Sequence, residues 1–308
     1  MLPSTFHLSS PDGPKIYVRR WAPSGRKPKA SILIAHGAAE HGQRYERLAK
    51  ALTARACMVY VPDLRGHGKT AGKLGNAGKA GVDGFNGMIR DLQQLGNVAA
   101  SENAAAPVLL FGHSMGAALA QRFIQLPGVK LRGVILSGSP GLQPGLEQAV
   151  ALTAAAAKGA AADQISTLFQ QSFARFNQEF APSKTGFEWL SRDPHEVEKY
   201  AVDPWCGFPL SNRLVAEMAQ VCLEAAKRES IARIPKELPV LLFSGQDDPV
   251  GGKGEFVEKL AQQYRDAGMR EVTLNLYPAG RHEMLNETNR PQVQADLIAW
   301  VEKHLGKS

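Results

Sequence analysis

The chain has 308 residues, of which 44% are hydrophobic and 21% are charged. This composition excludes a disordered chain, a coiled coil and a disulfide scaffold, and a chain of this length can bury a large core. The longest apolar stretch, residues 149–162, contains Lys158 and is shorter than the roughly 18 residues of a membrane span, so it predicts an Ala-rich helix.

The cysteines and the N-terminal segment indicate the cellular compartment. Cys57, Cys206 and Cys222 are an odd, sparse set without the spacing of a metal or redox motif, which fits reduced thiols. The first 20 residues contain no apolar signal core. We therefore expect a cytoplasmic protein.

The formal net charge is +7, and part of it is concentrated near the N-terminus. The six basic residues there are Lys15, Arg19, Arg20, Arg26, Lys27 and Lys29. A basic patch suits an anionic membrane surface or a nucleic acid, and the alternative is an ordinary solvated surface. We favour the solvated surface and expect no nucleic-acid partner, because no nucleic-acid motif accompanies the patch; peripheral membrane contact stays open.

Short apolar runs alternate with helical patterns along the chain. Residues 5–9 and 15–21 flank Ser-Pro-Asp-Gly, which predicts a hairpin. Further strands are predicted over residues 30–35, 58–62, 108–111, 133–136, 240–243 and 272–276. Helices are predicted over residues 45–53, 88–100, 117–125, 254–267 and 291–304. This alternation predicts an α/β fold, with a mainly parallel sheet and helices on both faces.

One long stretch interrupts the alternation. We expect residues 140–236 to form a helical cap, inserted after the sixth strand into a core made of residues 1–139 and 237–308. Inside the cap, Phe169, Phe173, Phe176 and Phe180 recur at helical spacing. They form either the packed seam of a lid helix or the wall of an acyl pocket, and we favour packing.

Glycine occurs at every third position from Gly72 to Gly87. The run contains no proline and is too short for a triple helix. We expect a flexible loop there.

The most informative motif is Gly112-His-Ser-Met-Gly116, which follows an apolar strand and opens a helix. This context indicates a nucleophile elbow, in which a strained turn exposes the Ser114 hydroxyl above the sheet. A chance match is the alternative in a chain with 30 glycines, and the flanking strand and helix make it the weaker one. We assign His113 a packing role, because its position next to the serine points it away from the hydroxyl.

A serine nucleophile needs a base and a carboxylate, which follow in the order Ser, Asp or Glu, His in this kind of fold. Asp247 and Asp248 lie in the loop after one predicted strand, and His282 lies in the loop after the next. We choose Asp248 over Asp247, since adjacent loop residues tend to point apart, and we choose His282 as the base.

The oxyanion of an acyl-transfer reaction needs backbone N–H donors. We expect one from Met115, after the nucleophile, and one from Ala38, in the loop after the strand at residues 30–35. His36 and His41 invite a metal site, but their spacing lacks the helical face of a metalloprotease motif. We expect no metal and no cofactor.

A further loop, Pro62-Asp-Leu-Arg-Gly-His-Gly68, contains Asp63, Arg65 and His67. These side chains either line the cleft or brace the loop through an ion pair. We favour the braced loop.

Together, these motifs resemble the monoacylglycerol lipase and lysophospholipase-like α/β-hydrolases, particularly bacterial ones. The motifs are His36-Gly-Ala-Ala-Glu-His-Gly, Pro62-Asp-Leu-Arg-Gly-His-Gly, Gly112-His-Ser-Met-Gly, Gly245-Gln-Asp-Asp-Pro-Val, His282-Glu-Met-Leu-Asn-Glu and Val202-Asp-Pro-Trp-Cys-Gly-Phe. The resemblance covers nearly the whole chain. It implies an α/β-hydrolase fold with Ser114, Asp248 and His282 as catalytic residues and Ala38 and Met115 as oxyanion donors. It also implies a cap over an acyl-binding pocket.

The expected function is a serine hydrolase that cleaves carboxylic esters of lipid-like substrates, of the monoacylglycerol or lysophospholipid type, through an acyl-enzyme on Ser114. One alternative is an amidase or peptidase with the same residues. Another is a ligand-binding protein without catalysis, because a fold does not fix a function.

Overall fold

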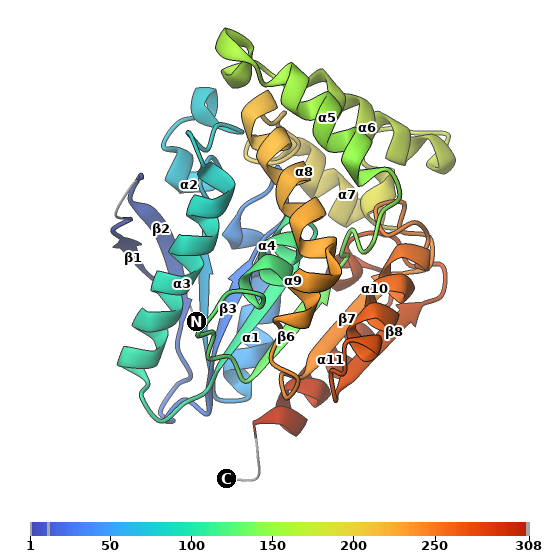
Figure 1. The fold of residues 1–308 in the computed structure, drawn as a ribbon. Helices are drawn as coiled ribbons and strands as arrows, with labels where there is room; N and C mark the ends of the chain where they lie inside the picture. Colours follow the sequence, from blue (N-terminus) through green and yellow to red (C-terminus); the bar gives the residue numbers. More distant parts are fainter. Residues whose placement is uncertain (1, 11–12, 306–308) are drawn as a thin grey trace.

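The computed structural model describes residues 2–10 and 13–305. Its centre is an eight-stranded sheet with the strand order β1-β2-β4-β3-β5-β6-β7-β8 (Figure 1). The strands are β1 (Ser4–Leu8), β2 (Ile16–Trp21), β3 (Ala30–Ala35), β4 (Cys57–Pro62), β5 (Val108–His113), β6 (Gly133–Ser137), β7 (Val240–Gly245) and β8 (Val272–Tyr277). β2 pairs antiparallel with β1 and β4, and all other pairs are parallel.

The predicted sheet is confirmed, and each strand begins and ends close to its expected residues. The N-terminal hairpin is present, although Pro11 and Asp12 of its expected turn lie outside the described residues. The prediction works because β3, β5, β6 and β7 are covered on both faces, so every one of their residues is buried. A near-continuous apolar run is the sequence pattern of such strands.

Helices cover both faces of the sheet, as expected (Figure 1). One face packs against α1 (Glu46–Ala54) and α11 (Arg290–His304). The other packs against α3 (Gly84–Glu102), α4 (Met115–Phe123) and α10 (Glu255–Asp266). Alternate residues of one strand enter the two cores, as Leu33 and Ile34 of β3 do.

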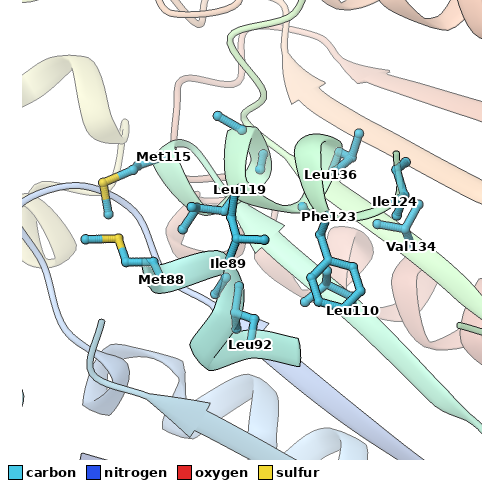
Figure 2. Close-up of a cluster of buried hydrophobic side chains, with 14 of the residues drawn as sticks. Met88, Ile89, Leu92, Leu110, Met115, Leu119, Phe123, Ile124, Val134 and Leu136 are labelled. Atoms are coloured by element: carbon cyan, nitrogen blue, oxygen red, sulfur yellow. The ribbon is translucent and has the colours of Figure 1, made fainter. Parts of the chain in front are cut away.

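Helix α4 is held firmly between its neighbours. Figure 2 shows side chains of α4 meeting those of α3 and of strands β5 and β6. The labelled side chains are Met88, Ile89, Leu92, Leu110, Met115, Leu119, Phe123, Ile124, Val134 and Leu136, and all are less than one-tenth exposed. This packing fixes the start of α4, where Ser114 lies.

The insertion after the sixth strand is helical, as predicted. It contains α5 (Leu146–Ala156), α6 (Thr167–Asn177), α7 (Pro194–Val202), α8 (Asn212–Ala226) and α9 (Arg228–Ala232). The limits 140–236 stay a prediction for the extent of the cap. The remaining short helices are α2 (Gly68–Ala71), η1 (Gly42–Tyr45), η2 (Leu74–Asn76), η3 (Gly159–Asp163), η4 (Gln178–Phe180), η5 (Glu188–Leu190) and η6 (Met284–Asn286).

The expectation of a loop through the whole glycine run is wrong, since α3 begins at Gly84. A Cβ on Gly87 would lie 2.3 Å from the Arg65 guanidinium, and one on Gly78 would lie 2.1 Å from the Pro209 carbonyl oxygen of the cap. Close approach therefore explains these two glycines. A Cβ on Gly72 would have no atom of the described residues within 4 Å. The three-residue spacing of the glycines therefore does not arise from one shared contact.

Two residues of the predicted basic patch are paired with carboxylates and do not contribute an unpaired positive charge to the surface. Arg19 is buried and donates to Asp63, and Arg20 pairs with Glu102. Their charges are neutralised by the fold itself, which a count of basic residues does not reveal. Over residues 2–10 and 13–305, no helix combines the length and apolar character needed to cross a bilayer.

The two glycine environments make a matched pair for a stability test. Gly72 and Gly78 both have φ near +80°, at +76° and +82°, so alanine at either position costs about 1–2 kcal/mol of backbone strain. Gly78→Ala additionally collides with Pro209 and should lose about 1–3 kcal/mol more. Thermal melting should therefore rank wild type above Gly72→Ala and Gly72→Ala above Gly78→Ala. Equal melting temperatures for the two variants would contradict the close contact between this loop and the cap.

Candidate active site

The turn between β5 and α4 has the backbone geometry of a nucleophile elbow. Ser114 has φ 53° and ψ −114°, a conformation that L residues rarely adopt. A Cβ on Gly112 would lie 2.2 Å from the Gly116 carbonyl oxygen, and one on Gly116 would lie 2.1 Å from the Ala35 carbonyl oxygen. The two glycines are therefore required by close backbone approach, and the turn leaves Ser114 half-buried at the start of α4.

The structure brings Asp248 and His282 together. His282 Nδ1 lies 3.0 Å from both Asp248 carboxylate oxygens, and both side chains are buried. The carboxylate also accepts hydrogen bonds from Ser244 Oγ and the Val250 N–H, each at 2.9 Å. Asp247, the neighbouring carboxylate that was not predicted to pair with the histidine, is exposed.

This contact changes the ionisation of both groups. Burial raises the pKa of Asp248, but the charge and hydrogen bond of His282 outweigh it and hold that pKa below its usual range. Burial lowers the pKa of His282, and the Asp248 carboxylate outweighs burial, so this pKa lies above its usual value of 6.5. Since Nδ1–H donates to the carboxylate, neutral His282 has Nε2 available as an acceptor.

Ser114 and His282 line the same cavity. In the part of the chain that the structure describes, the serine hydroxyl makes no hydrogen bond to the imidazole. Such contacts often tighten only when substrate is bound. His113 also lines this cavity, and its ring centroid lies 4.8 Å from that of His282, so it lies nearer the site than its sequence position predicts.

The loop after β3 leaves the N–H of Ala38 available. The Gly37 N–H donates to Glu40, and the Ala39 N–H donates to His67 Nε2 at 3.2 Å. His36 Nδ1 donates to the Gly37 carbonyl oxygen at 2.8 Å, and a planar trans peptide then directs the Ala38 N–H the opposite way. Ala38 lines the cavity with Met115, the first residue of α4, so the structure brings both predicted donors to one wall.

The histidines that support this loop are neutral. Burial lowers the pKa of His36, and burial together with the neighbouring His36 lowers the pKa of His67 to about 3. Each ring accepts a backbone N–H on Nε2, His36 from Leu64 and His67 from Ala39. Sequence reasoning missed these roles, because nothing in the local sequence pairs residue 67 with residue 39.

The loop containing Asp63 and Arg65 is braced by two ion pairs. Asp63 accepts from Arg19, and Arg65 donates to Asp91 at 2.7 Å. Neither lines the large cavity, so the braced-loop interpretation is the better one. The partners lie far away in sequence, which is why the motif did not reveal them.

One group of side chains in the described residues could hold a metal ion. Ligand atoms of His41, Asp203 and Cys206 all lie within 4.8 Å of one another. His41 Nε2 already lies 2.9 Å from the Asp203 carboxylate, so these two groups satisfy each other without an ion. The sequence expectation of no metal stays a prediction.

A cavity of about 570 Å³ lies between Ser114 and the cap. Its wall on the cap side is mostly apolar, with Gln171, Ser172 and Arg175 among its polar residues, and its apolar residues include Leu146, Leu152, Leu168, Phe169, Phe173, Phe176, Val215 and Met218. The phenylalanine stripe therefore both packs, around Trp189, and lines the cavity. Helix α6 ends at Asn177, so Phe180 leaves the stripe and packs under the Arg281 guanidinium.

A charge group consists of Arg44 and two buried carboxylates, Glu40 and Glu283, and the carboxylates line the cavity. Arg44 donates to Glu40 at 2.5 Å and contacts both oxygens of Glu283, at 2.6 and 2.7 Å. Burial raises the pKa of Glu40, but Arg44 and nearby histidines outweigh it and lower this pKa to about 2. Two carboxylates thus share one guanidinium, and Glu40, Glu283 and Tyr200 face the same space as Ser114.

Comparison with known proteins connects this geometry to a family. The model of the serine aminopeptidase S33 family matches residues 26–289. A monoglyceride lipase from Rattus norvegicus is 30% identical over 304 residues, covering 95% of this chain and 87% of the relative. A monoacylglycerol lipase from Mycolicibacterium smegmatis is 25% identical and covers 95% of both chains.

Solved structures give the same result. A thermostable carboxyl esterase from Bacillus coagulans has a TM-score of 0.92 at 26% identity, covering 99% of this chain and all of that one. A lipase in an open form has a TM-score of 0.90 at 29% identity, with the same coverage. These similarities assign the chain to the serine ester hydrolases of the lipase and esterase type. The chain belongs to the serine aminopeptidase S33 family of α/β-hydrolases and, as the resemblance of its motifs predicted, is a homologue of monoglyceride lipases.

Proposed function

We propose that this protein cleaves monoacylglycerol-like esters through an acyl-enzyme on Ser114. The observation that carries the proposal is the buried His282–Asp248 pair, whose imidazole lines one largely apolar cavity together with the elbow serine. The cavity volume is typical of a small-molecule site.

The proposed reaction uses only this chain's groups and water. His282 Nε2 takes the Ser114 proton while the serine oxygen attacks the ester carbonyl carbon. The Ala38 and Met115 N–H groups stabilise the oxyanion, and Asp248 stabilises the imidazolium. The oxyanion collapses, the bond to the alcohol oxygen breaks, and His282 protonates that oxygen. Water then attacks the acyl-enzyme by the same steps, which releases the acid and restores Ser114.

The polar end of the cavity favours an ester over a peptide with a free N-terminus. An aminopeptidase needs a carboxylate to bind the substrate's ammonium group, and both Glu40 and Glu283 are already held by Arg44. The apolar wall contributed by α5, α6 and α8 suits an acyl chain, since each buried methylene stabilises a complex by about 0.8 kcal/mol.

The same charge group favours a neutral alcohol over a phosphate-bearing one. Glu40, Arg44 and Glu283 together carry one net negative charge beside the nucleophile, whereas the cationic Arg175 on the cap side of the cavity is exposed and screened by solvent, so an anionic head group would chiefly meet the negative charge. We therefore prefer a monoacylglycerol to a lysophospholipid with a net negative charge.

A fluorophosphonate probe tests the nucleophile. The wild type should be labelled, and Ser114→Ala should not be, because the probe forms its bond with the serine oxygen. Gel fluorescence with equal amounts of folded protein gives the result, and Ser172→Ala, which removes a hydroxyl from the cavity wall, is the control. Equal labelling of wild type and Ser114→Ala would refute the mechanism, and an unlabelled wild type would favour the non-catalytic alternative.

The pH profile of kcat/KM tests the base. Neutral His282 is the active form, and Asp248 raises its pKa, so activity should rise through a midpoint above 6.5. Asp248→Asn removes the charge but keeps the burial, so the midpoint of any remaining activity should move to lower pH. The rate should fall by roughly 10³–10⁴. A midpoint that does not move in Asp248→Asn would contradict the assigned pairing.

Head-group preference tests the buried charge group. The wild type should cleave a monoacylglycerol with a higher kcat/KM than the matching lysophosphatidate. At about 8 Å and an effective dielectric constant near 20, one charge changes the energy by about 2 kcal/mol, or roughly 30-fold. Glu283→Gln should reduce the ratio, since the pair of Arg44 with Glu40 is then neutral. An unchanged ratio in a folded variant would place the leaving alcohol elsewhere.

A further inference from the structure

One segment of the cap, residues 187–207, contacts both loops that supply the proposed catalytic groups. We call this segment the cap arm; it includes η5 and α7. Its N-terminal part lies against the loop of His282, and its C-terminal part lies against the loop of Ala38. The cavity wall formed by α5, α6 and α8 lies outside it.

At the first contact, the cap arm holds the imidazole and its backbone. The Trp189 ring centroid lies 4.9 Å from that of His282, and Trp189 is only 3% exposed. The His282 N–H donates to the Trp189 carbonyl oxygen at 3.3 Å, and the Glu283 N–H donates to that of Leu190 at 2.7 Å. With His113 also against the ring, the imidazole has little freedom to rotate.

Buried charges anchor this part of the arm. Glu287 is fully buried and accepts the N–H groups of Arg192 and Arg281, both at 3.0 Å. The Arg281 guanidinium donates to the Glu188 carbonyl oxygen at 2.6 Å. The arm and the His282 loop therefore form one hydrogen-bonded unit.

At the second contact, the cap arm holds a strained peptide of the oxyanion loop. Ala39 has φ 53°, which costs about 1–2 kcal/mol for a residue with a side chain, so its neighbours must stabilise it. Its carbonyl oxygen accepts from Tyr200 Oη at 2.8 Å and from the Gly207 N–H at 2.9 Å. Asp203 of the arm also binds His41, two residues further along the loop.

Tyr200 therefore completes a set of restraints on consecutive peptides. His36 holds the carbonyl of the peptide that contains the Ala38 N–H, and His67 holds the N–H of the next peptide. Tyr200 holds the carbonyl of the third. The first two restraints come from the core and the third comes from the cap.

We propose that the cap arm is a positioning element of the catalytic machinery, in which Tyr200 fixes the oxyanion loop and Trp189 fixes the imidazole of His282. The proposal rests on the proposed function above. Neither side chain touches the reacting atoms; each acts through the group it holds. Trp189 and Tyr200 also line the cavity, together with the wall formed by α5, α6 and α8.

Tyr200→Phe tests the contact with the oxyanion loop, because it removes a single hydroxyl. Loss of a complete oxyanion donor lowers kcat by roughly 10²–10³, so a misplaced donor should lower kcat by about tenfold with little change in KM. Tyr60→Phe is the matched control, since it also removes a buried hydroxyl, one that donates to Glu102 at 2.7 Å away from the site. A kcat for Tyr200→Phe within twofold of that control would overturn the role of Tyr200.

Trp189→Leu tests the contact with the imidazole. Without the indole, water should reach His282, and because burial lowers this pKa, the acid midpoint of the pH profile should rise, by about 0.5 of a unit, as kcat falls. Trp300→Leu is the control, because Trp300 also lies against a histidine, His304, with centroids 4.2 Å apart. An unmoved midpoint in a folded Trp189→Leu would overturn the role of Trp189.

The proposed function and the positioning role of the cap arm can fail separately. A wild type that is not labelled at Ser114 and hydrolyses no ester contradicts the proposed function. A wild type that is labelled and active, with Tyr200→Phe and Trp189→Leu matching their controls, contradicts only the positioning role. A fall in melting temperature without a change in kcat or pH midpoint indicates a purely structural arm and likewise overturns the positioning role.

Discussion

The site depends on one close backbone contact, where the first turn of α4 passes beneath the end of β3. A Cβ on Gly116 would lie 2.1 Å from the Ala35 carbonyl oxygen and 2.7 Å from that of His36, so only glycine permits it. This approach brings the loop that begins at His36 beside Ser114 and Met115. Two N–H groups from distant parts of the sequence can then face one oxygen. Without it, the proposed oxyanion site would not lie beside the strained serine turn.

Burial then separates the histidines of the site into two kinds. His36, His67 and His113 are buried, and among the described residues none of their rings forms an ion pair or hydrogen bond with a carboxylate; their pKa values are lowered, to about 3 for His67 and about 4 for His113. His282 is equally buried but touches Asp248, and its pKa is raised. The same desolvation thus keeps the supporting rings neutral, while a single carboxylate prepares one ring to accept a proton.

The parts of this arrangement that follow from local spacing could be predicted from the sequence. The strand before Gly112, the helix after Ser114 and the loops of Asp248 and His282 each depend on a short window of residues, and the structure has them at the expected places. The choice of Asp248 over Asp247 needed only the tendency of neighbouring side chains to point apart. The parts that depend on distant pairs could not be predicted, since Tyr200 and Ala39 lie 161 residues apart, and Arg44 and Glu283 lie 239 residues apart. The end of the glycine run was wrongly predicted as loop, since α3 begins at Gly84, and the contacts of Gly78 with Pro209 and of Gly87 with Arg65 likewise join distant residues.

Two parts of the cap therefore differ in how they contact the core, although both line the cavity. The arm from residue 187 to 207 is joined to the core by hydrogen bonds of the buried Glu287, of the Arg281 guanidinium and of main-chain groups, so the proposed positioning role predicts that changes there disturb the reacting geometry. The apolar wall of α5, α6 and α8 contacts the cavity without touching the loops of Ala38 or His282 through any hydrogen bond among the described residues. We propose that substitutions on that wall alter which acyl chain fits while the proposed oxyanion donors and the imidazole stay in place, so that one catalytic arrangement serves different substrates.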